Sequence, residues 1–424
     1  MTDSSVLTTF KRDVLGDTRL PPTDLHPSDF MMQYLLDHHY GHFETALFDY
    51  FRSGWSAWRT FSSVLRWRFG QDLKSPRLLD FASGFGRITR WMVSDIPARN
   101  LVVADIFPEA LSFQRDLLGV RTAISSATPD LLEIGQFFDC IIASSFFSHI
   151  GPHQFPAWLD RLLGALNSDG LLVFSVHGAE LVNADQSLYE PTSEIDSLPG
   201  ERYGTSWVTE RFVVESVRAL RPSASIRRLP KALWSYQDLY IVALDGRSIV
   251  PPLLEPVAFM ERAERIPHSR TLYLQGWAFH PTGESVTVDI RLNGAVVART
   301  SADGLRPDVA RYFQNHLIAR SGWGAQIDCP SPLPGNTSIS VIAVAENGLT
   351  FPMNIGSLEA IELYVRLRTA QVLADTASAE ALRLRRLVEH MRRSRFWRVR
   401  ESWHRLTRHF RSPDGEAQRL GRDA

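Results

Sequence analysis

One aspartate and two glycines form the first group of residues whose types and spacing predict chemistry. The apolar residues Leu78 and Leu79 lead into Asp80, and Gly84 and Gly86 follow at once in a small-residue loop. Glycines let a ligand approach the backbone closely, and a helix that starts directly after them offers unpaired N–H groups. A strand, a glycine-rich loop and a helix in this order predict a site for a nucleotide-type cofactor.

The loop favours S-adenosylmethionine over NAD. A dinucleotide fingerprint needs a third glycine for close packing of helix on strand, but Thr89 stands at that position. A carboxylate such as Asp80 would repel a pyrophosphate, whereas it would attract the ammonium and sulfonium groups of S-adenosylmethionine. Because one glycine-rich loop is a weak signal, the choice between the two cofactors depends on the flanking segments.

A second acid follows the next apolar run. Residues 101–104 are apolar and lead into Asp105, about 20 residues after the glycines, where ribose-binding acids lie in such folds. Pro108 then stands at a favourable first-turn position for a helix over residues 109–118. We therefore expect Asp105 at the end of a second strand, followed by a second covering helix.

Two further apolar runs carry polar residues at their ends. Residues 138–143 lead into Ser144 and Ser145, and residues 171–176 lead into His177. Continuous apolar strands that alternate with helices form a parallel sheet covered on both faces. Such a sheet binds ligands at the carboxyl ends of its strands, so these residues should join the two aspartates at one edge.

Residues 46–246 resemble class I S-adenosylmethionine-dependent methyltransferases. The resemblance rests on four segments in the family's order and spacing, namely Leu79–Arg87, Ala104–Leu111, Phe138–Ala143 and Leu166–Ser175. It implies an α/β fold with a seven-stranded Rossmann-like sheet and an enzyme that uses S-adenosyl-L-methionine.

The resemblance also implies a role for each matching residue. Asp80 would hold the methionyl amine, Asp105 the ribose hydroxyls, and Ile106 would lie against adenine. The remaining cofactor-lining positions are Ala82, Ser83, Gly84 and Gly86, with Ser144 and Ser145 beside the methyl donor. The acid that often binds the adenine amino group has no counterpart in residues 125–128, so that contact stays open.

Histidines offer two further interpretations. His149 follows the third of these strands and could act as general base for a hydroxyl acceptor, since histidine titrates near neutrality. It could equally be a structural histidine bonded to the backbone. His38, His39 and His42 lack the accompanying cysteines or carboxylates of a metal site, so we interpret them as a polar helix face and expect no metal.

Residues 257–355 have the pattern of an all-β sandwich. Period-two alternation over 286–292 and an Asn293-Gly294 turn predict a β-hairpin. The segment resembles a β-sandwich module appended to bacterial glycosyltransferases and other glycan-modifying enzymes. That resemblance implies a binding or docking role, while a purely stabilising appendage is the open alternative.

Residues 357–411 are expected to form a basic amphipathic helical tail. Between Arg383 and Arg411 there are eleven arginines against two glutamates. Aromatic and apolar residues recur there every three to four positions, so the segment could lie on an anionic membrane or pair with a partner helix as a coiled coil. No nucleic-acid-binding fold accompanies the charge, so no nucleic acid is expected.

Composition and the positions of apolar segments give the remaining expectations. With 44% hydrophobic and 22% charged residues and two distant cysteines, the chain is typical of a globular protein in a reducing compartment. The N-terminus lacks an apolar leader, and no apolar run is long enough to span a membrane. The predicted parts are a mobile 1–28, a methyltransferase domain with a helical cap over 29–250, the sandwich, the tail and a disordered 412–424.

Together the resemblances imply a cytoplasmic bacterial enzyme, peripheral on the inner face of the membrane. It would O-methylate a cell-surface polysaccharide or a lipid-linked glycan precursor. Two alternatives stay open, namely a methyltransferase of a lipid or secondary metabolite, and a scaffold that binds S-adenosylmethionine and organises glycan enzymes.

Overall fold

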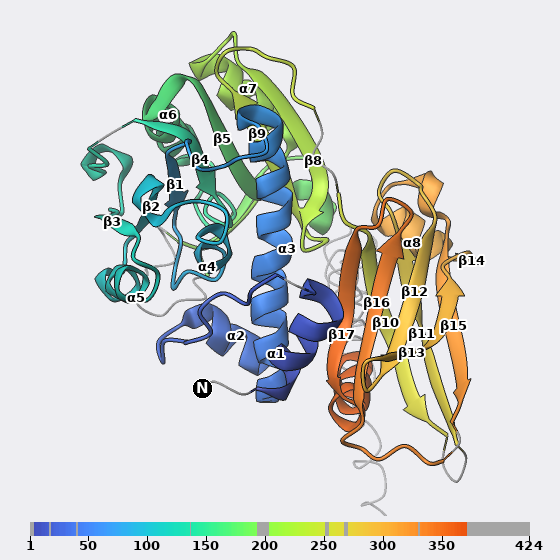
Figure 1. The fold of residues 1–424 in the computed structure, drawn as a ribbon. Helices are drawn as coiled ribbons and strands as arrows, with labels where there is room; N and C mark the ends of the chain where they lie inside the picture. The colour runs from blue at the N-terminus through green and yellow to red at the C-terminus, as the bar shows by residue number, and fades with distance from the viewer. Residues whose placement is uncertain are drawn as a thin grey trace, which may run out of the picture. The chain divides into compact units, whose positions relative to one another are not determined.

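A sheet with helices on both faces organises the first part of the chain (Figure 1). The computed structural model describes residues 4–16, 18–39, 41–135, 137–192, 203–250, 254–266, 270–329 and 331–370. The main strands of this sheet are β1 (Leu78–Phe81), β2 (Leu101–Asp105), β3 (Arg121–Ile124), β4 (Phe138–Ala143), β5 (Leu166–Gly178), β8 (Ser225–Leu233) and β9 (Gln237–Ala243).

The order of these strands creates a ligand-binding edge. Strands β3, β2, β1, β4 and β5 are parallel neighbours in that order, whereas β9 runs antiparallel beside β5 and β8 antiparallel beside β9. Chain progression reverses between β1 and β4, which makes the carboxyl end of β1 a topological switch point. Open α/β sheets bind their ligands at such a point, and Asp80 lies on β1.

The seven-strand prediction needs a correction. Among the described residues the sheet has nine strands, because a short hairpin of β6 (Leu188–Glu190) and β7 (Thr205–Val208) is added to it. Strand β7 pairs with His177 and Gly178 at the far end of β5, which is long enough to take part in both arrangements. The polar segment after the fifth strand therefore extends the sheet instead of forming only a loop.

Successive residues of the central strands face opposite layers, as the strand repeat requires. Leu78, Val103 and Ile142 join one core with the N-terminal helices, α4 (Thr89–Met92) and α5 (Pro108–Leu118). Leu79 and Ile141 join the other core with α6 (Phe155–Gly164) and α7 (Glu210–Leu220). Burial on both faces explains why these strands read as continuous apolar runs.

The N-terminal residues differ from the expected mobile segment. Helix α1 (Ser5–Phe10) and the π-helical turn Lys11–Leu15 contribute Phe10, fully buried, to the first core. The predicted helical cap is present as α2 (Phe30–His38) and α3 (Phe43–Phe69). Helix α1 is too short for its apolar residues to form a recognisable helical pattern in the sequence. So short a helix is stabilised by tertiary packing rather than by its own propensity.

The polar-face interpretation of the three histidines is wrong for one of them. His39 is buried and its Nε2 lies 2.6 Å from Asp49 Oδ2, whereas His42 caps the start of α3. His39 at the end of α2 and His42 at the start of α3 therefore have different structural roles.

Helix α3 approaches the glycine-rich loop most closely at Gly54. A Cβ there would lie 2.2 Å from the backbone oxygen of Arg87. We expect Gly54→Ala to lower the free energy of unfolding by about 1–3 kcal/mol, because the added methyl overpacks a rigid contact. Denaturant titration measures this change. The matched control is Gly164→Ala in α6, where no atom lies within 4 Å and higher helix propensity should make the change neutral or stabilising. Equal losses in both variants would contradict the close contact.

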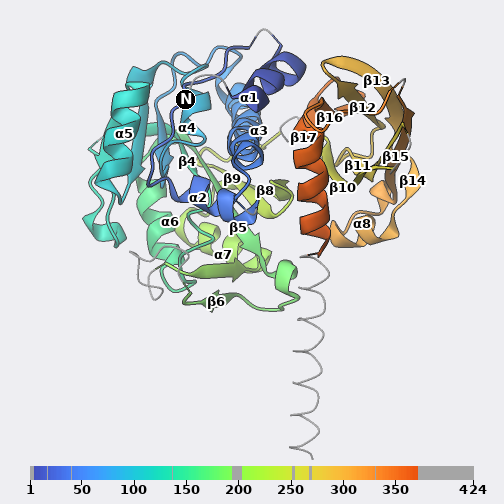
Figure 2. The same ribbon diagram turned by 90° about the horizontal axis from the view of Figure 1, so that it is seen from below.

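The second part contains two four-stranded antiparallel sheets (Figure 2). One has the order β10-β11-β15-β14 and the other β13-β12-β16-β17. Their bounds are β10 (Val257–Arg265), β11 (Thr271–Phe279), β12 (Val286–Leu292), β13 (Ala295–Ser301), β14 (Gly304–Leu305), β15 (Arg320–Asp328), β16 (Ser338–Ala345) and β17 (Thr350–Ser357), with α8 (Pro307–Tyr312) between β14 and β15.

The sequence-predicted hairpin is confirmed in this part. Asn293 and Gly294 both have positive φ, 50° and 88°, as the two-residue turn between β12 and β13 requires. Strands β10 and β17 and helix α8 were not predicted. For the two strands, the neighbouring strand β11 or β16 supplies the pairing that their own sequences do not signal.

The predicted tail falls largely outside the described residues. Residues 358–370 are helical, but the arginine-rich segment 383–411 and residues 412–424 are not described. Within the described ranges, none of the helices has the length and apolarity needed to cross a membrane.

Candidate functional site

Asp80 is the third residue of β1, a strand buried along its whole length, and only 2% of its surface is exposed. The hydroxyl of Thr89, at the start of α4, donates a hydrogen bond of 2.7 Å to its Oδ2. The pKa of Asp80 is raised to about 7, chiefly by burial and also by the neighbouring charge of Asp105, while the Thr89 bond opposes the rise. No described basic side chain forms an ion pair with Asp80, so a cationic ligand would stabilise its ionised form.

Asp105 holds the glycine-rich loop in shape. Its Oδ2 accepts a hydrogen bond of 2.7 Å from the backbone N–H of Gly84, and its Oδ1 accepts one of 3.1 Å from that of Phe107. Burial raises the pKa of Asp105, and the backbone N–H groups of Phe107, Gly84 and Ile106 oppose that rise. The carboxylate thus links the end of β2 to the loop that follows β1.

The loop itself adopts a backbone that few residues tolerate. Ala82, Gly84 and Gly86 have positive φ values of 57°, 56° and 80°. A Cβ on Gly84 would meet nothing within 4 Å, whereas one on Gly86 would lie 2.8 Å from Gln114 Oε1. A ligand that contacts the backbone needs open space such as that beside Gly84. The left-handed conformation of Ala82, a non-glycine residue, is typical of a functional site.

Gln114 supports this loop and was missed in the sequence. Its Nε2 donates to Ser83 Oγ at 2.8 Å and to the Gly84 oxygen at 2.7 Å, while its Oε1 is buried without a hydrogen-bond partner in the described structure. The signal available in the sequence was the spacing of Gln114, which shares one helical face with Ala110, Leu111 and Leu118. Of the predicted cofactor-lining residues, Ser83, Gly84 and Asp105 are therefore joined in one hydrogen-bond network.

The serines after β4 lie beside β5 and β9. Ser145 has φ of 59°, its backbone N–H donates to Ser175 Oγ at 2.8 Å, and its hydroxyl donates to Gln237 Oε1 at 3.1 Å. The hydroxyl of Ser144 is buried and has no hydrogen-bond partner among the described residues. Gln237, at the start of β9, was not predicted, because it lies 92 residues from Ser145 in the chain.

His149 is fixed by the hairpin that extends the sheet. Its Nδ1 lies 2.9 Å from the Gly204 oxygen, and the Gly204 N–H donates to the His149 oxygen at 2.8 Å. A carbonyl oxygen only accepts, so Nδ1 carries the proton and Nε2 carries the lone pair in the neutral ring. The ring also stacks on Tyr203, with centroids 4.6 Å apart. Both predicted roles of His149, as a base and as a backbone-bonded residue, are compatible with this geometry.

A second histidine and several aromatic rings surround this position. The centroid of His177 lies 6.1 Å from that of His149, 4.9 Å from Tyr236 and 6.3 Å from Trp207. Gln237 Nε2 donates toward His177 Nε2 at 3.2 Å. Burial, together with a smaller effect of the neighbouring His149, lowers the pKa of His177 to about 4. His177 is therefore neutral near pH 7, in a site lined by ring faces.

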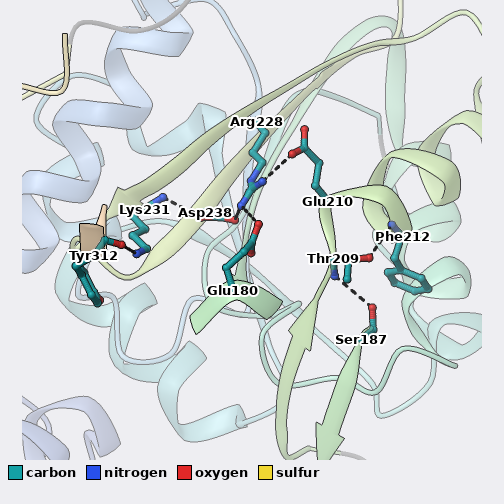
Figure 3. Close-up of polar contacts among 9 residues, drawn as sticks. All are labelled: Glu180, Ser187, Thr209, Glu210, Phe212, Arg228, Lys231, Asp238 and Tyr312. Carbon is teal, nitrogen blue, oxygen red and sulfur yellow. Dashed lines mark hydrogen bonds and ion pairs between the residues drawn. The ribbon is translucent and has the colours of Figure 1, made fainter. Parts of the chain in front are cut away.

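Arg228 forms ion pairs with three carboxylates near the start of β9 and the end of β5, the strands that carry Gln237 and His177 (Figure 3). Arg228 of β8 donates to Asp238 Oδ2 at 2.9 Å, to Glu210 Oε2 at 2.7 Å and to Glu180 Oε1 at 2.9 Å. Burial alone would lower the pKa of Arg228, but these carboxylates raise it above its ordinary value. Three acids surround Arg228, and Lys231 brings a second positive charge to the same cluster, so opposite charges there are nearly balanced.

Gly178 allows that cluster to pack against the end of β5. A Cβ there would lie 2.6 Å from Glu180 Oε2 and 2.8 Å from Asp238 Oδ2. Because Gly178 follows His177 and Asp238 follows Gln237, the ion cluster holds both ends of the His177–Gln237 contact.

Comparison with known proteins finds similar solved structures but does not assign the chain to a family. Neither the protein-family models nor the curated proteins searched match this chain. Solved structures that match include an S-adenosylmethionine-dependent methyltransferase from Clostridium acetobutylicum, 15% identical, covering 46% of this chain and 92% of its own at a TM-score of 0.34. Another is the 1,6-didemethyltoxoflavin-N1-methyltransferase of Burkholderia thailandensis with S-adenosylhomocysteine, 17% identical, covering 53% and 93% at 0.33. A third, from Mesorhizobium loti, is an S-adenosylmethionine-dependent methyltransferase, 13% identical, covering 41% and 92% at 0.32. The strand order and site geometry of this chain, rather than these likenesses, support the proposal below.

Proposed function

We propose that this chain is an S-adenosylmethionine-dependent methyltransferase that transfers a methyl group to a hydroxyl of a glycan. The observation that carries the proposal is the pair Asp80 and Asp105, both buried, at the ends of two adjacent strands around a left-handed glycine loop. Two buried acids at a switch point suit a ligand that offers a cation and hydroxyl groups, and do not suit a pyrophosphate.

The residues present suit the cofactor. Asp80 would receive its ammonium group, and Asp105 would accept hydrogen bonds from the ribose hydroxyls, with Ile106 against adenine. The unpartnered buried hydroxyl of Ser144 and the left-handed Ser145 would flank the reacting end. S-adenosylmethionine, when bound, supplies an electrophilic methyl group on a sulfonium. The chain supplies orientation, which contributes much of the rate in such a transfer.

His149 would take the proton from the acceptor hydroxyl. The bond from Nδ1–H to the Gly204 oxygen fixes the ring so that Nε2 is the basic nitrogen. His177 is neutral near pH 7, so it adds no positive charge to that of the cofactor's sulfonium group. These two features favour removal of a proton from a neutral hydroxyl.

Ring faces support a sugar as the acceptor. Tyr203, Trp207 and Tyr236 lie around the two histidines, and flat aromatic faces pack well against the C–H faces of pyranose rings. A surface polysaccharide, or the sugar portion of a lipid-linked precursor, offers such faces.

The location remains part of the proposal. Residues 383–411, whose sequence has an arginine-rich face opposite an aromatic one, would bind an anionic membrane surface or a partner helix. The β-sandwich would bind the glycan or dock the enzyme. Both would keep the methyltransferase part near a glycan assembled at the inner face of the membrane.

Envelope chemistry tests the proposed function. Methylated sugars released from a strain that lacks this chain are compared by mass spectrometry with those of its parent, and with strains that regain either the native chain or Asp105→Ala. We expect one O-methyl sugar to disappear and to return only with the native chain. An unchanged sugar profile, with cofactor binding intact in the purified protein, would favour the scaffold or a lipid or secondary-metabolite acceptor instead.

His149→Ala should lower kcat by about a hundred- to ten-thousandfold, because general base catalysis typically contributes that much. Binding of S-adenosylhomocysteine should stay unchanged, since the assigned role concerns the acceptor proton. Label transfer from radioactive S-adenosylmethionine to envelope glycan measures kcat, and calorimetry measures binding. The control is His153→Ala, an exposed histidine four residues later. Full activity of the His149 variant would leave that residue a structural role only.

A further inference from the structure

The hairpin of β8 and β9 has a backbone that is rare outside glycine. Lys231, Trp234 and Ser235 are left-handed, with φ of 50°, 53° and 61°. Strained non-glycine residues persist where their surroundings fix them, and they gather at ligand sites. The same hairpin carries Tyr236, whose ring lies beside His177 in the proposed acceptor site. The strain therefore lies in the segment that forms one side of that site.

Three anchors hold this hairpin in place. The indole Nε1 of Trp234 donates to the backbone oxygen of Ser53 in α3 at 3.0 Å. The backbone N–H of Lys231 donates to Asp238 Oδ1 at 2.8 Å, across the hairpin. The third anchor is the Lys231 ammonium, which donates to the backbone oxygen of Tyr312, the last residue of α8 in the β-sandwich (Figure 3). The hairpin thus joins the first sheet to the sandwich.

Lys231 also fixes the ring of Tyr312. Its Nζ lies 3.7 Å from the centre of that ring, and the ring of Phe313 lies edge-on to it, with centroids 4.9 Å apart. Phe313 in turn packs on Phe279 and Trp277 of β11, with centroids 4.8 and 5.8 Å apart. Even so, 49% of Tyr312 is exposed. An exposed ring that the protein already holds in place needs little further ordering when a ligand binds.

Tyr236 links the acceptor site to this ring. Its ring centroid lies 4.9 Å from that of His177, and 42% of Tyr236 is exposed. Tyr236 is close in the chain to Asp238, which binds the backbone of the lysine that holds Tyr312. The pKa of Tyr312 is raised, chiefly by burial and also by the neighbouring Tyr236. Exposed aromatic rings therefore begin at the acceptor site and continue on the sandwich, as in a binding groove.

We propose that Tyr236 and Tyr312 bind successive sugars of the acceptor, so that the substrate is an oligosaccharide chain and the β-sandwich forms part of its binding site. This inference rests on the proposed function and adds the length of the acceptor to it. Flat ring faces pack against sugars, and phenolic hydroxyls exchange hydrogen bonds with sugar hydroxyls. Tyr312 lies outside the group of rings around His149 and His177, so only a chain longer than the methylated sugar would use it.

Acceptor fragments of increasing length test the inference on the full chain. The probes are size fractions of a partial acid hydrolysate of envelope polysaccharide from a strain that lacks this chain, so their methylation sites are free. Label transfer from radioactive S-adenosylmethionine gives kcat and KM for each fraction. For the native chain we expect kcat/KM to rise about two- to tenfold, through a lower KM, once the fragments are long enough to reach Tyr312, because one aromatic contact contributes about that much.

Variants assign this rise to the ring. Tyr312→Ala should abolish it by raising KM for the long fragments, whereas Tyr312→Phe, which keeps the ring, should retain most of it. Lys231→Met removes the cation that holds the ring and should reduce the rise. The matched control is Phe137→Ala, a similarly exposed aromatic residue at the amino end of β4, which should keep the full rise. Thermal unfolding checks that each variant is folded.

The outcomes separate this inference from the function on which it rests. A native kcat/KM that does not depend on fragment length, or an equal loss on short and long fragments in Tyr312→Ala, would overturn the inference and leave the two tyrosines to a protein partner or to structure. Absence of transfer to every fragment, with S-adenosylhomocysteine still bound, would instead overturn the proposed glycan acceptor and this inference with it.

Discussion

Asp105→Ala is expected to weaken the binding of S-adenosylhomocysteine by at least about a hundredfold. Hydrogen bonds to a charged group contribute roughly 1.5–3 kcal/mol each, and the carboxylate would accept two from the ribose. The change also leaves the N–H groups of Gly84 and Phe107 without their acceptor, so the loop loses the shape that the ligand needs. Isothermal titration of the purified chain measures the affinity.

The matched control for this variant is Asp116→Ala, an exposed acid near the end of α5. Its affinity should equal that of the native chain. Thermal unfolding of both variants distinguishes a lost contact from a lost fold, and Asp105→Asn keeps the volume where the alanine variant proves unstable. Native affinity in a folded Asp105 variant would remove the ribose role and, with it, the main support for the cofactor.

The affinity for S-adenosylhomocysteine should rise with pH as Asp80 ionises. Burial raises the pKa of Asp80 to about 7, and only the carboxylate attracts the ligand's ammonium group. Below pH 7 the affinity should therefore fall by about tenfold for each pH unit, and it should level off above. Titrations between pH 5.5 and 7.5 test this, because free α-amino groups titrate only above that range.

The same group makes the stability of the ligand-free chain move in the opposite direction. The unfolded pKa of an aspartate is 3.8, and the folded value lies near 7. Between these values the folded chain holds a proton that the unfolded chain has released, so this contribution to stability is complete below pH 3.8 and is lost as pH rises through 7. Asp80→Asn should bind the ligand weakly at every pH and should remove this share of both pH dependences. A native pH profile in that variant would assign the titration to another group.

Local patterns carried enough information to predict the form of the loop at the proposed cofactor site. An apolar run, an acid and a glycine loop are contiguous in the chain, so residues 78–86 already specify a strand end and a ligand-accessible backbone. The positive φ values of Gly84 and Gly86, and the bond from the Gly84 N–H to Asp105, confirm that the loop has the expected form. The parallel order of β2, β1 and β4 then brings the predicted ends together.

The sheet prediction failed where pairing depends on distant partners. Strands β6 and β7 are only three and four residues long and lack an apolar run, so nothing local marks them. They exist because β5 continues past the central sheet and offers unpaired backbone at His177 and Gly178. The buried helix α1 is a similar case, since its burial depends on a core built from later segments.

By itself the sequence determined the strand–loop–helix unit and the positions of the two aspartates, because neighbouring residues encode these features. Only the tertiary structure decided which residues surround them. Gln237 meets Ser145 across 92 positions, and Trp234 meets Ser53 across 181. Contacts at such separations follow from strand order and helix packing, and neither a glutamine at the start of a strand nor a tryptophan in a turn has a local pattern that indicates its partner.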